Sequence, residues 1–138
     1  MNYYTINIRS YSTEDKGTLS FFEGMKDFPF DIKRIYYIYG VGADVVRGGH
    51  AHKELKQILF CPYGKIILEM DDGKNKKDIV LDEPSKAIVI LKPVWRNVHW
   101  MQDNSVLCAA VSDYYDENDY IRDYSDFIEY INRGMSNE

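Results

Sequence analysis

The chain has 138 residues with an apolar fraction of 45%, so we expect one domain over 1–138 with a buried core. Its net charge of −5 argues against nucleic acid as the main partner. No apolar run approaches the roughly 20 residues of a membrane helix, and residues 1–10 lack a signal-peptide pattern. Cys61 and Cys108 lie among apolar residues, as expected for buried thiols in a reducing cytoplasm.

Short runs typical of β-strands, separated by turn residues, dominate the sequence. Asp72-Gly73 between two such runs indicates a hairpin. About nine strands at this spacing favour an antiparallel sandwich or small barrel, here an all-β jelly roll. The predicted strands cover 3–8, 18–23, 33–39, 55–62, 65–70, 76–81, 86–91, 96–101 and 106–112.

The C-terminal region has a different period. Phe127, Ile128 and Ile131 share one helical face, with Ser125 as the expected cap and Gly134 as the expected stop. The sequence therefore predicts one short C-terminal helix, 125–134, packed on the barrel.

Two of the three histidines, His50 and His52, form a His-x-His motif. Alternate residues of a strand face the same side, so the two imidazoles are expected side by side. Such a pair can hold a metal, pack in a barrel wall, or form a metal-free site in which histidine is a base.

Metal-binding cupins carry His-x-His, then Glu after a short gap, then Gly. Here Gln57 stands at the carboxylate position, although Gly64 fits. In the second cupin motif, Val98 replaces the last histidine, and His99 points to the opposite face.

A transition-metal site usually has three or four protein ligands. Only His50 and His52 remain in place, although Glu54 can share their face, so a different metal site stays open. We favour a site without metal or other cofactor, with histidine as the base.

Several segments together resemble the sugar 3,4-ketoisomerases of the RmlC-like cupin group, which include WxcM-like proteins. The resemblance spans about Thr5 to Tyr130. Its segments are IKRIYYIY (32–39), RGGHAHKELKQIL (47–59), DDGK (71–74), KPVW (92–95) and SDYYDENDYIRDY (112–124).

This resemblance implies a metal-independent homodimer with exchanged N-terminal strands. It implies an enzyme that converts dTDP-4-keto-6-deoxyglucose into a dTDP-3-keto-6-deoxyhexose through an enediol. The product would be used for 3-amino-3,6-dideoxy sugars of surface polysaccharides, such as lipopolysaccharide or S-layer glycan.

The resemblance also implies roles for individual residues. The catalytic base falls on His52, with His50 as donor or shuttle, and Arg47 precedes the pair. Tyr36 is a donor candidate near the sugar. Arg34 and Arg47 are the first candidates for the diphosphate, with Lys16 and Arg96 behind them. The strand pattern leaves open whether Arg34 and Tyr36, or their neighbours, face the cavity.

Two positions depart from the family pattern. Many members have Trp-His-Glu where this chain has Trp95-Arg96-Asn97. Arg96 cannot act as an acid at ordinary pH, but it can hold an oxyanion or a phosphate. Asp15-Lys16-Gly17 stands where the family has Asp-x-Arg-Gly, so Lys16 keeps the charge without the planar fork.

Three alternatives remain: a cupin that binds a nucleotide sugar without turnover, the related 3,5-epimerase, and a metal-dependent oxygenase. The epimerase motif is not found, and Gln57 and Val98 disfavour the oxygenase. Residues 112–124 are expected to pack on the barrel and the dimer partner rather than to act in catalysis. The stereochemistry of the product at C4 stays open.

Overall fold

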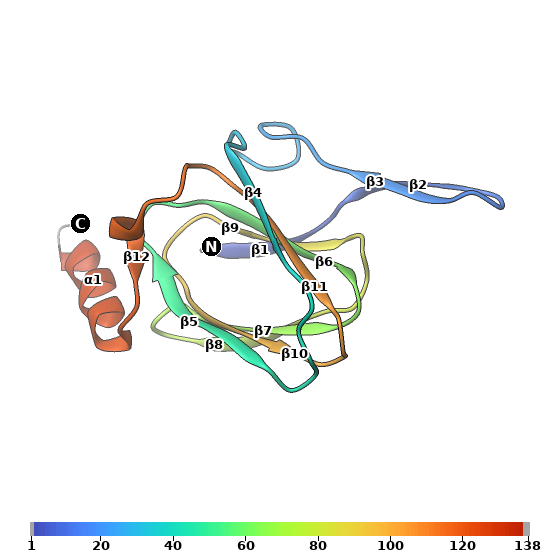
Figure 1. Ribbon diagram of the computed structural model, residues 1–138. Coiled ribbons are helices and arrows are strands. Elements are labelled where there is room, and N and C mark those ends of the chain that lie inside the picture. The colour runs from blue at the N-terminus through green and yellow to red at the C-terminus, as the bar shows by residue number, and fades with distance from the viewer. Residues whose placement is uncertain (1, 137–138) are drawn as a thin grey trace.

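The computed structural model describes residues 2–136, with side chains for 2–134. Its helical elements are η1 (Glu117–Asp119) and α1 (Tyr124–Ser136). Its strands, labelled in Figure 1, are β1 (Tyr3–Asn7), β2 (Arg9–Thr13), β3 (Gly17–Phe21), β4 (Arg34–Ile38), β5 (Val46–His52), β6 (Gln57–Tyr63), β7 (Ile66–Asp71), β8 (Lys76–Leu81), β9 (Lys86–Ile90), β10 (Trp95–Trp100), β11 (Val106–Val111) and β12 (Tyr120–Ile121).

Two five-stranded antiparallel sheets curve around a common interior (Figure 1). Their strand orders are β1-β9-β6-β11-β4 and β12-β5-β10-β7-β8. Alternation along β7 explains the arrangement, because Ile66, Leu68 and Met70 are buried while Glu69 is exposed. The predicted all-β architecture is confirmed, and so is the hairpin at Asp72-Gly73, which joins β7 to β8.

A second apolar cluster lies on the outer face of the first sheet. Phe28 and Phe30, from the segment before β4, pack with Ile58 of β6 and Val89 of β9. Both faces of β6 and β9 are therefore covered. This explains why their sequences are nearly continuous apolar runs rather than alternating ones.

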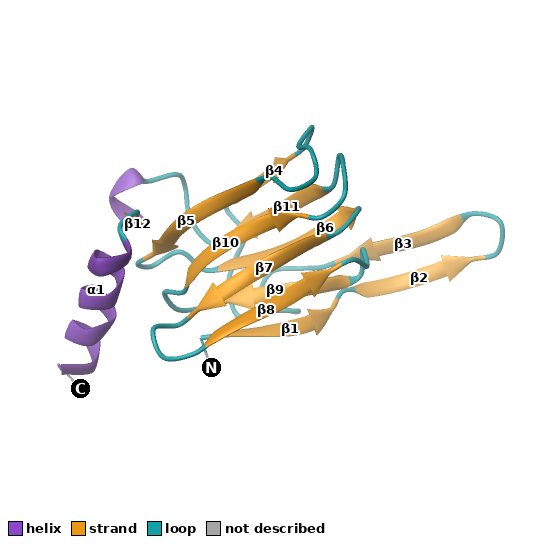
Figure 2. Cartoon of the chain, turned by 90° about the horizontal axis from the view of Figure 1, so that it is seen from below, coloured by secondary structure: helices purple, strands orange, loops and turns teal. Residues whose placement is uncertain are grey.

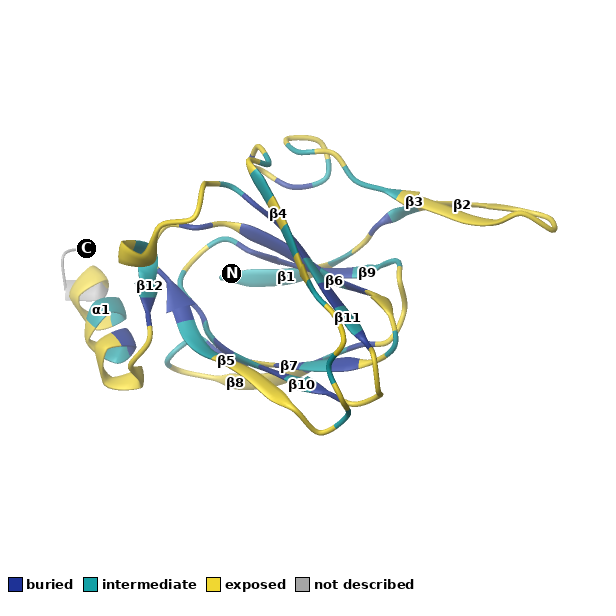
Figure 3. Ribbon diagram, in the orientation of Figure 1, coloured by how far each residue is buried: buried dark blue, intermediate teal, exposed yellow. Residues whose placement is uncertain are grey.

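The β2–β3 hairpin projects away from the barrel (Figure 2). Its two strands pair with each other, from Arg9↔Phe21 to Thr13↔Gly17, and with no other strand of the described residues. The hairpin is mostly exposed (Figure 3), including the apolar side chains of Tyr11 and Leu19. β1, in contrast, pairs with β9 of the same chain.

The C-terminal helix is confirmed, but its expected boundaries are wrong. Asp123, not Ser125, caps α1, because its Oδ1 accepts the backbone N–H of Asp126 at 3.0 Å. Gly134 lies inside the helix instead of ending it. Phe127 is fully buried against β5 and β12, as its predicted face requires. Neither helical element among residues 2–136 is long and apolar enough to cross a membrane.

Gly64, in the turn after β6, has a φ of +93°, and a Cβ there would collide with the Ser105 side chain and lie 2.7 Å from Ser105 Cα. Gly40 has a similar φ of +72° but nothing within 4 Å. We expect Gly40→Ala to cost roughly 1–2 kcal/mol from backbone strain alone. Gly64→Ala should cost clearly more, because the Ser105 turn must also shift. Urea unfolding of both variants measures the difference, and equal losses would contradict this packing argument.

Candidate active site

A cavity of about 380 Å³ lies between the two sheets. β4 contributes Arg34 and Tyr36, whereas Ile35 and Tyr37 on its other face are exposed. The face of β4 that carries Arg34 and Tyr36, which the sequence pattern left open, is therefore the one turned toward the cavity. The remaining polar lining comes from the opposite sheet and from the segments on either side of β12: Arg47, His50, Arg96, Tyr115, Tyr120 and Arg122.

Arg96 is the most deeply buried charge of this cavity, with 3% of its surface exposed. Its Nη2 donates to Gln57 Oε1 at 3.0 Å and to His50 Nε2 at 3.3 Å. Tyr36 Oη also donates to Gln57 Oε1, at 3.3 Å. Both acceptors of Arg96 are uncharged, and no ion pair among the described residues includes this guanidinium.

Gly48 allows β5 to approach Arg96. Its φ is +112°, and a Cβ at this position would lie 2.7 Å from the Arg96 carbonyl oxygen. The pairing of β5 with β10 shifts register between Arg96 and Asn97, next to this contact. The close approach brings the arginine side chain and the His50 ring to the same part of the cavity wall.

The side chains present do not fit the metal site of a cupin. Gln57 offers a neutral amide where a carboxylate ligand would stand, and its oxygen already accepts from Arg96. The same guanidinium contacts the ring nitrogen of His50 that would face a metal. Across residues 2–134 no group of three or more His, Cys, Asp or Glu side chains is arranged to hold a metal ion, which leaves the alternative through Glu54 without support.

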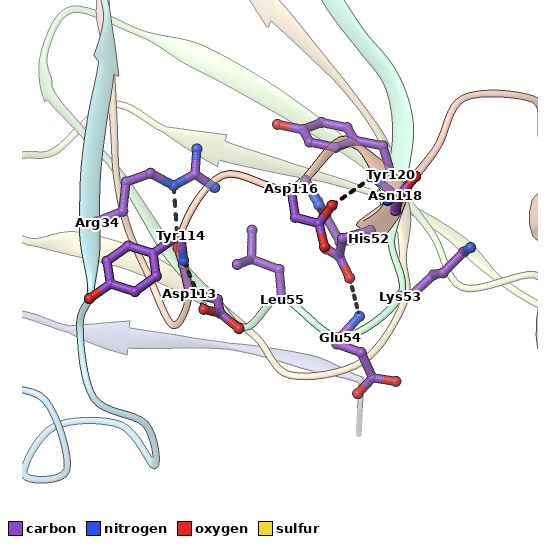
Figure 4. Close-up of a pocket in the computed structure, with 11 residues that line it drawn as sticks. Arg34, His52, Lys53, Glu54, Leu55, Asp113, Tyr114, Asp116, Asn118 and Tyr120 are labelled. Atoms are coloured by element: carbon purple, nitrogen blue, oxygen red, sulfur yellow. Dashed lines mark hydrogen bonds and ion pairs between the residues drawn. The ribbon is translucent and has the colours of Figure 1, made fainter.

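His52 has a different set of neighbours. Its Nδ1 lies 3.0 Å from Asp119 Oδ2, and its ring centroid lies 4.3 Å from that of Tyr120. The rings of His50 and His52 are 5.1 Å apart and nearly perpendicular. His52 lines a second pocket of about 280 Å³, which shares Arg34 and Tyr120 with the first cavity (Figure 4).

Burial and nearby guanidinium groups together lower the pKa of both histidines to about 3. After burial, Arg96 is the largest cause in each case. The negative charge of Glu117 acts in the opposite direction on His52, because it favours the protonated ring. Both imidazoles are therefore neutral at pH 7, and each has one nitrogen with a lone pair.

Asp119 and Tyr120 were missed by the sequence analysis, which favoured a packing role for residues 112–124. They reach the site because β12 pairs with β5, with Tyr120 opposite His52. Arg122 was missed too, and its guanidinium lies 4.3 Å from the centroid of the Tyr120 ring. The available signal was the concentration of aromatic and charged residues in this stretch.

Most of the sequence-predicted site residues meet at the cavity, but Lys16 does not. Arg34, Tyr36, Arg47, His50 and Arg96 all line it. Lys16 lies in the exposed turn of the β2–β3 hairpin, which extends away from the barrel (Figure 2).

His99 points away from the cavity, as its position on the strand predicts. Its partly exposed ring bonds to Glu69 on the outer face of the sheet.

Barrel and site together define a cupin with a cation-lined cavity and two neutral histidines. The WxcM-like, C-terminal family, represented by FdtA, matches residues 1–132. The TDP-4-oxo-6-deoxy-alpha-D-glucose-3,4-oxoisomerase of Aneurinibacillus thermoaerophilus is 41% identical over 118 residues, covering 86% of this chain and 85% of the relative. This chain therefore belongs to the WxcM-like family.

Solved structures agree. A 3,4-ketoisomerase from Helicobacter canadensis has a TM-score of 0.91 and 40% identity, covering 96% of this chain and 98% of that one. QdtA, a sugar 3,4-ketoisomerase from Thermoanaerobacterium thermosaccharolyticum in complex with TDP, has a TM-score of 0.91 and 38% identity, covering 96% of both. Two variants of QdtA also match with TM-scores of 0.89: a histidine-to-asparagine variant with TDP-4-keto-6-deoxyglucose, and a tyrosine-to-arginine, arginine-to-histidine variant with TDP.

A more distant structure confirms the fold alone. The Mycobacterium tuberculosis RmlC epimerase has a TM-score of 0.74 at 15% identity, covering 86% of this chain and 67% of that one. The predicted RmlC-like cupin fold is thus confirmed.

The lowered histidine pKa values predict how stability depends on pH. With folded-state pKa values of about 3 against the ordinary 6.5, the unfolded chain binds protons below pH 6.5 that the folded chain does not. The free energy of unfolding should therefore fall as pH drops from 6.5 towards 3, by roughly 1–2 kcal/mol per histidine between pH 7.5 and 5. Urea unfolding of the wild type and a His50→Gln/His52→Gln variant measures this.

The double variant should lose less stability over the same pH range, because its unfolded state takes up two fewer protons. Parallel curves for the wild type and the double variant would contradict the assignment of two buried neutral imidazoles.

Proposed function

We propose that this protein is a 3,4-ketoisomerase that converts TDP-4-keto-6-deoxyglucose into a TDP-3-keto-6-deoxyhexose. Family membership supports this activity, as do relatives of 38–41% identity that bear this function over nearly their whole lengths. The QdtA complexes with TDP and with TDP-4-keto-6-deoxyglucose support the substrate.

One observation carries the proposal: a buried guanidinium without an anionic partner stands beside two neutral imidazoles. Burying an uncompensated charge is costly, so the position of Arg96 indicates an anionic ligand or transition state. Arg34, Arg47 and Arg122 line the same cavity and suit a diphosphate. Neutral histidines suit proton abstraction next to a ketone, because only the neutral ring has a lone pair to accept the proton.

The isomerisation moves two protons. A base takes the hydrogen of C3, the C3–C4 double bond forms, and the C4 carbonyl oxygen gains negative charge. The hydroxyl proton on O3 is then lost as the C3 carbonyl forms, O4 ends as a hydroxyl, and C4 receives a proton. Atoms and electrons balance without a redox cofactor. One histidine can transfer the proton between C3 and C4, and the neighbouring histidine can transfer the proton between O3 and O4.

We assign the carbon-bound proton to His50 and the oxygen-bound proton to His52. The Nε2 lone pair of His50 becomes free for this step when Arg96 turns its Nη2 from His50 to the charge on the sugar oxygens. This assignment reverses the roles hypothesised from the sequence, and two observations favour it. His50 lines the cavity together with Arg47 and Arg96, whereas His52 lines the adjoining pocket. In the QdtA variants, the replaced histidine and the replaced arginine have the spacing of His50 and Arg96.

Arg96 stabilises the charge that develops on the sugar oxygens, and Gln57 Oε1, which accepts from its Nη2, keeps the guanidinium at the cavity wall. The single O–H of Tyr36 donates to the same Gln57 oxygen, so Tyr36 orients Gln57. Arg34 and Arg47 bind the diphosphate. The two cysteines are free, which agrees with the cytoplasmic location expected for an enzyme of nucleotide-sugar biosynthesis.

We further propose a homodimer in which the N-terminal β2–β3 hairpin is exchanged. The exposed apolar residues Tyr11 and Leu19 on a hairpin without a sheet of its own support a partner surface. Exchange would carry Lys16 to the cavity of the other subunit. The replaced tyrosine and arginine of the QdtA double variant have the spacing of Lys16 and Arg96, which supports a shared site.

The roles of the two histidines are tested by His50→Asn and His52→Asn. Each variant should lower turnover of TDP-4-keto-6-deoxyglucose by about 10²–10⁴-fold, because a positioned proton carrier is lost. Binding of TDP, measured by calorimetry, should stay within a few-fold of the wild type, because the arginines remain. In D₂O the wild type should place deuterium at C4 of the product.

The pattern of exchange separates the two histidines. His50→Asn should abolish exchange of the C3 hydrogen, whereas His52→Asn should retain slow exchange. The reverse pattern would return the C3 base to His52. A wild type that binds the nucleotide sugar without any turnover would instead favour the non-catalytic binding protein.

Mixing two inactive variants tests the exchanged hairpin. Lys16→Ala damages the hairpin turn and His50→Asn the cavity, so each should be inactive as a homodimer. After unfolding and refolding together, half of the dimers are mixed and each has one intact site if Lys16 acts across the interface. Activity should then recover to about a quarter of the wild type. No recovery in a mixture shown by mass spectrometry to contain mixed dimers would contradict action in trans.

A further inference from the structure

Asp119 is bound to three consecutive residues at the end of β5. Its Oδ2 contacts His52 Nδ1 at 3.0 Å, its Oδ1 accepts the backbone N–H of Glu54 at 2.7 Å, and its carbonyl accepts the N–H of Lys53 at 2.9 Å. The carboxylate is therefore fixed in both position and orientation before any ligand binds. Its side chain is 16% exposed and the His52 side chain 4%, so solvent competes little for the bond.

This contact determines which nitrogen of His52 carries the proton. A carboxylate at pH 7 accepts hydrogen bonds and cannot donate, so His52 Nδ1 must be the donor and Nε2 must have the lone pair. His50 reaches the same tautomer differently, because Arg96 can only donate and so occupies the lone pair of His50 Nε2. The Asp119 carboxylate thus fixes the lone pair of His52 on Nε2, whereas the lone pair of His50 faces the Arg96 guanidinium.

We propose that Asp119 is a positioning residue that fixes His52 as the Nδ1–H tautomer and keeps its Nε2 ready to accept a proton. The proposal rests on the proposed isomerase function for its catalytic consequence, although the tautomer itself does not depend on any substrate. When Nε2 accepts the proton from O3, the ring becomes an imidazolium, and Asp119 stabilises that charge through the same hydrogen bond. The ring then returns the proton to O4 and is neutral again.

Asp119→Asn removes the negative charge with little change in size. The asparagine amide has one acceptor, which the Glu54 N–H engages, so its NH₂ group faces His52 Nδ1 and favours the opposite tautomer. We expect ¹⁵N NMR of the imidazole rings, without substrate at pH 7, to report Nδ1–H for His52 in the wild type and Nε2–H in the variant. The value of kcat should fall by about 10²–10⁴-fold, with TDP binding changed less than threefold.

Asp123→Ala is the control. Asp123 lies in the same segment and also accepts a backbone N–H, that of Asp126 at 3.0 Å, but it caps α1 and touches neither histidine. It should lower thermal stability while the His52 tautomer and kcat stay as in the wild type. This separates a general loosening of residues 116–124 from a specific effect on His52.

Two results would overturn the proposal. One is a wild-type His52 protonated at Nε2, which is measured without any variant and holds even if Asp119→Asn fails to fold. The other is an Asp119→Asn protein in which the His52 tautomer is unchanged. Any loss of activity in that variant would then have a structural cause and not a change of tautomer. A confirmed tautomer switch in a protein without isomerase activity would overturn the proposed function and leave the positioning by Asp119 standing.

Discussion

The buried guanidinium of Arg96 is the constraint around which this site is built. A fully desolvated charge with only neutral acceptors is unfavourable, so the surrounding structure has to hold it in place. Gln57 accepts its hydrogen bond, Gly48 lets β5 approach the backbone beside it, and Tyr36 orients the same glutamine. In a metal-binding cupin a carboxylate and imidazoles converge on a cation. Here the cation is a side chain, and a neutral amide replaces the carboxylate.

This replacement has a chemical consequence. A metal ion would engage the lone pairs of both histidines, whereas Arg96 engages only that of His50 and His52 bonds to Asp119 instead. Neutral imidazoles with different partners can move different protons. The site therefore keeps the His-x-His geometry of the cupin barrel but uses it for acid–base chemistry.

The sequence predicted those parts of the molecule that depend on local pattern. Period-two alternation located β7, and the bounds of β8 agree with the prediction residue by residue. β2 was missed because its residues are polar and exposed on both faces. A strand was expected at His50 and His52, but the exposed, glycine-rich first half of β5 lacks an apolar alternation and was not predicted. The cap of α1 was misplaced by two residues, since Ser125 and Asp123 are both good caps and only the geometry distinguishes them.

The site was predictable where one strand carries it and not where distant segments meet. His50 and His52 share a face because they are two apart on β5, and the inward face of β4 follows once the barrel closes. Asp119 lies 67 positions from its partner His52, and no local sequence pattern predicts that β12 pairs with β5. Gln57 was recognised only as a lost ligand. Its role as an acceptor becomes visible when Arg96, from another sheet, is placed beside it.

Finally, the charges of the cavity link substrate binding to base strength. In the free protein, burial and then Arg96 hold the histidine pKa values low, which keeps the rings neutral but makes them weak bases. A diphosphate bound to Arg34 and Arg47 as proposed brings negative charge next to Arg34, and so offsets part of the field that lowers the pKa of His52. The His52 imidazole should become a stronger base when the substrate is in place. With the diphosphate bound as proposed, the arginines would make proton abstraction depend on the nucleotide part of the substrate. A free 4-keto sugar, which lacks the diphosphate, would meet the weak bases of the empty cavity.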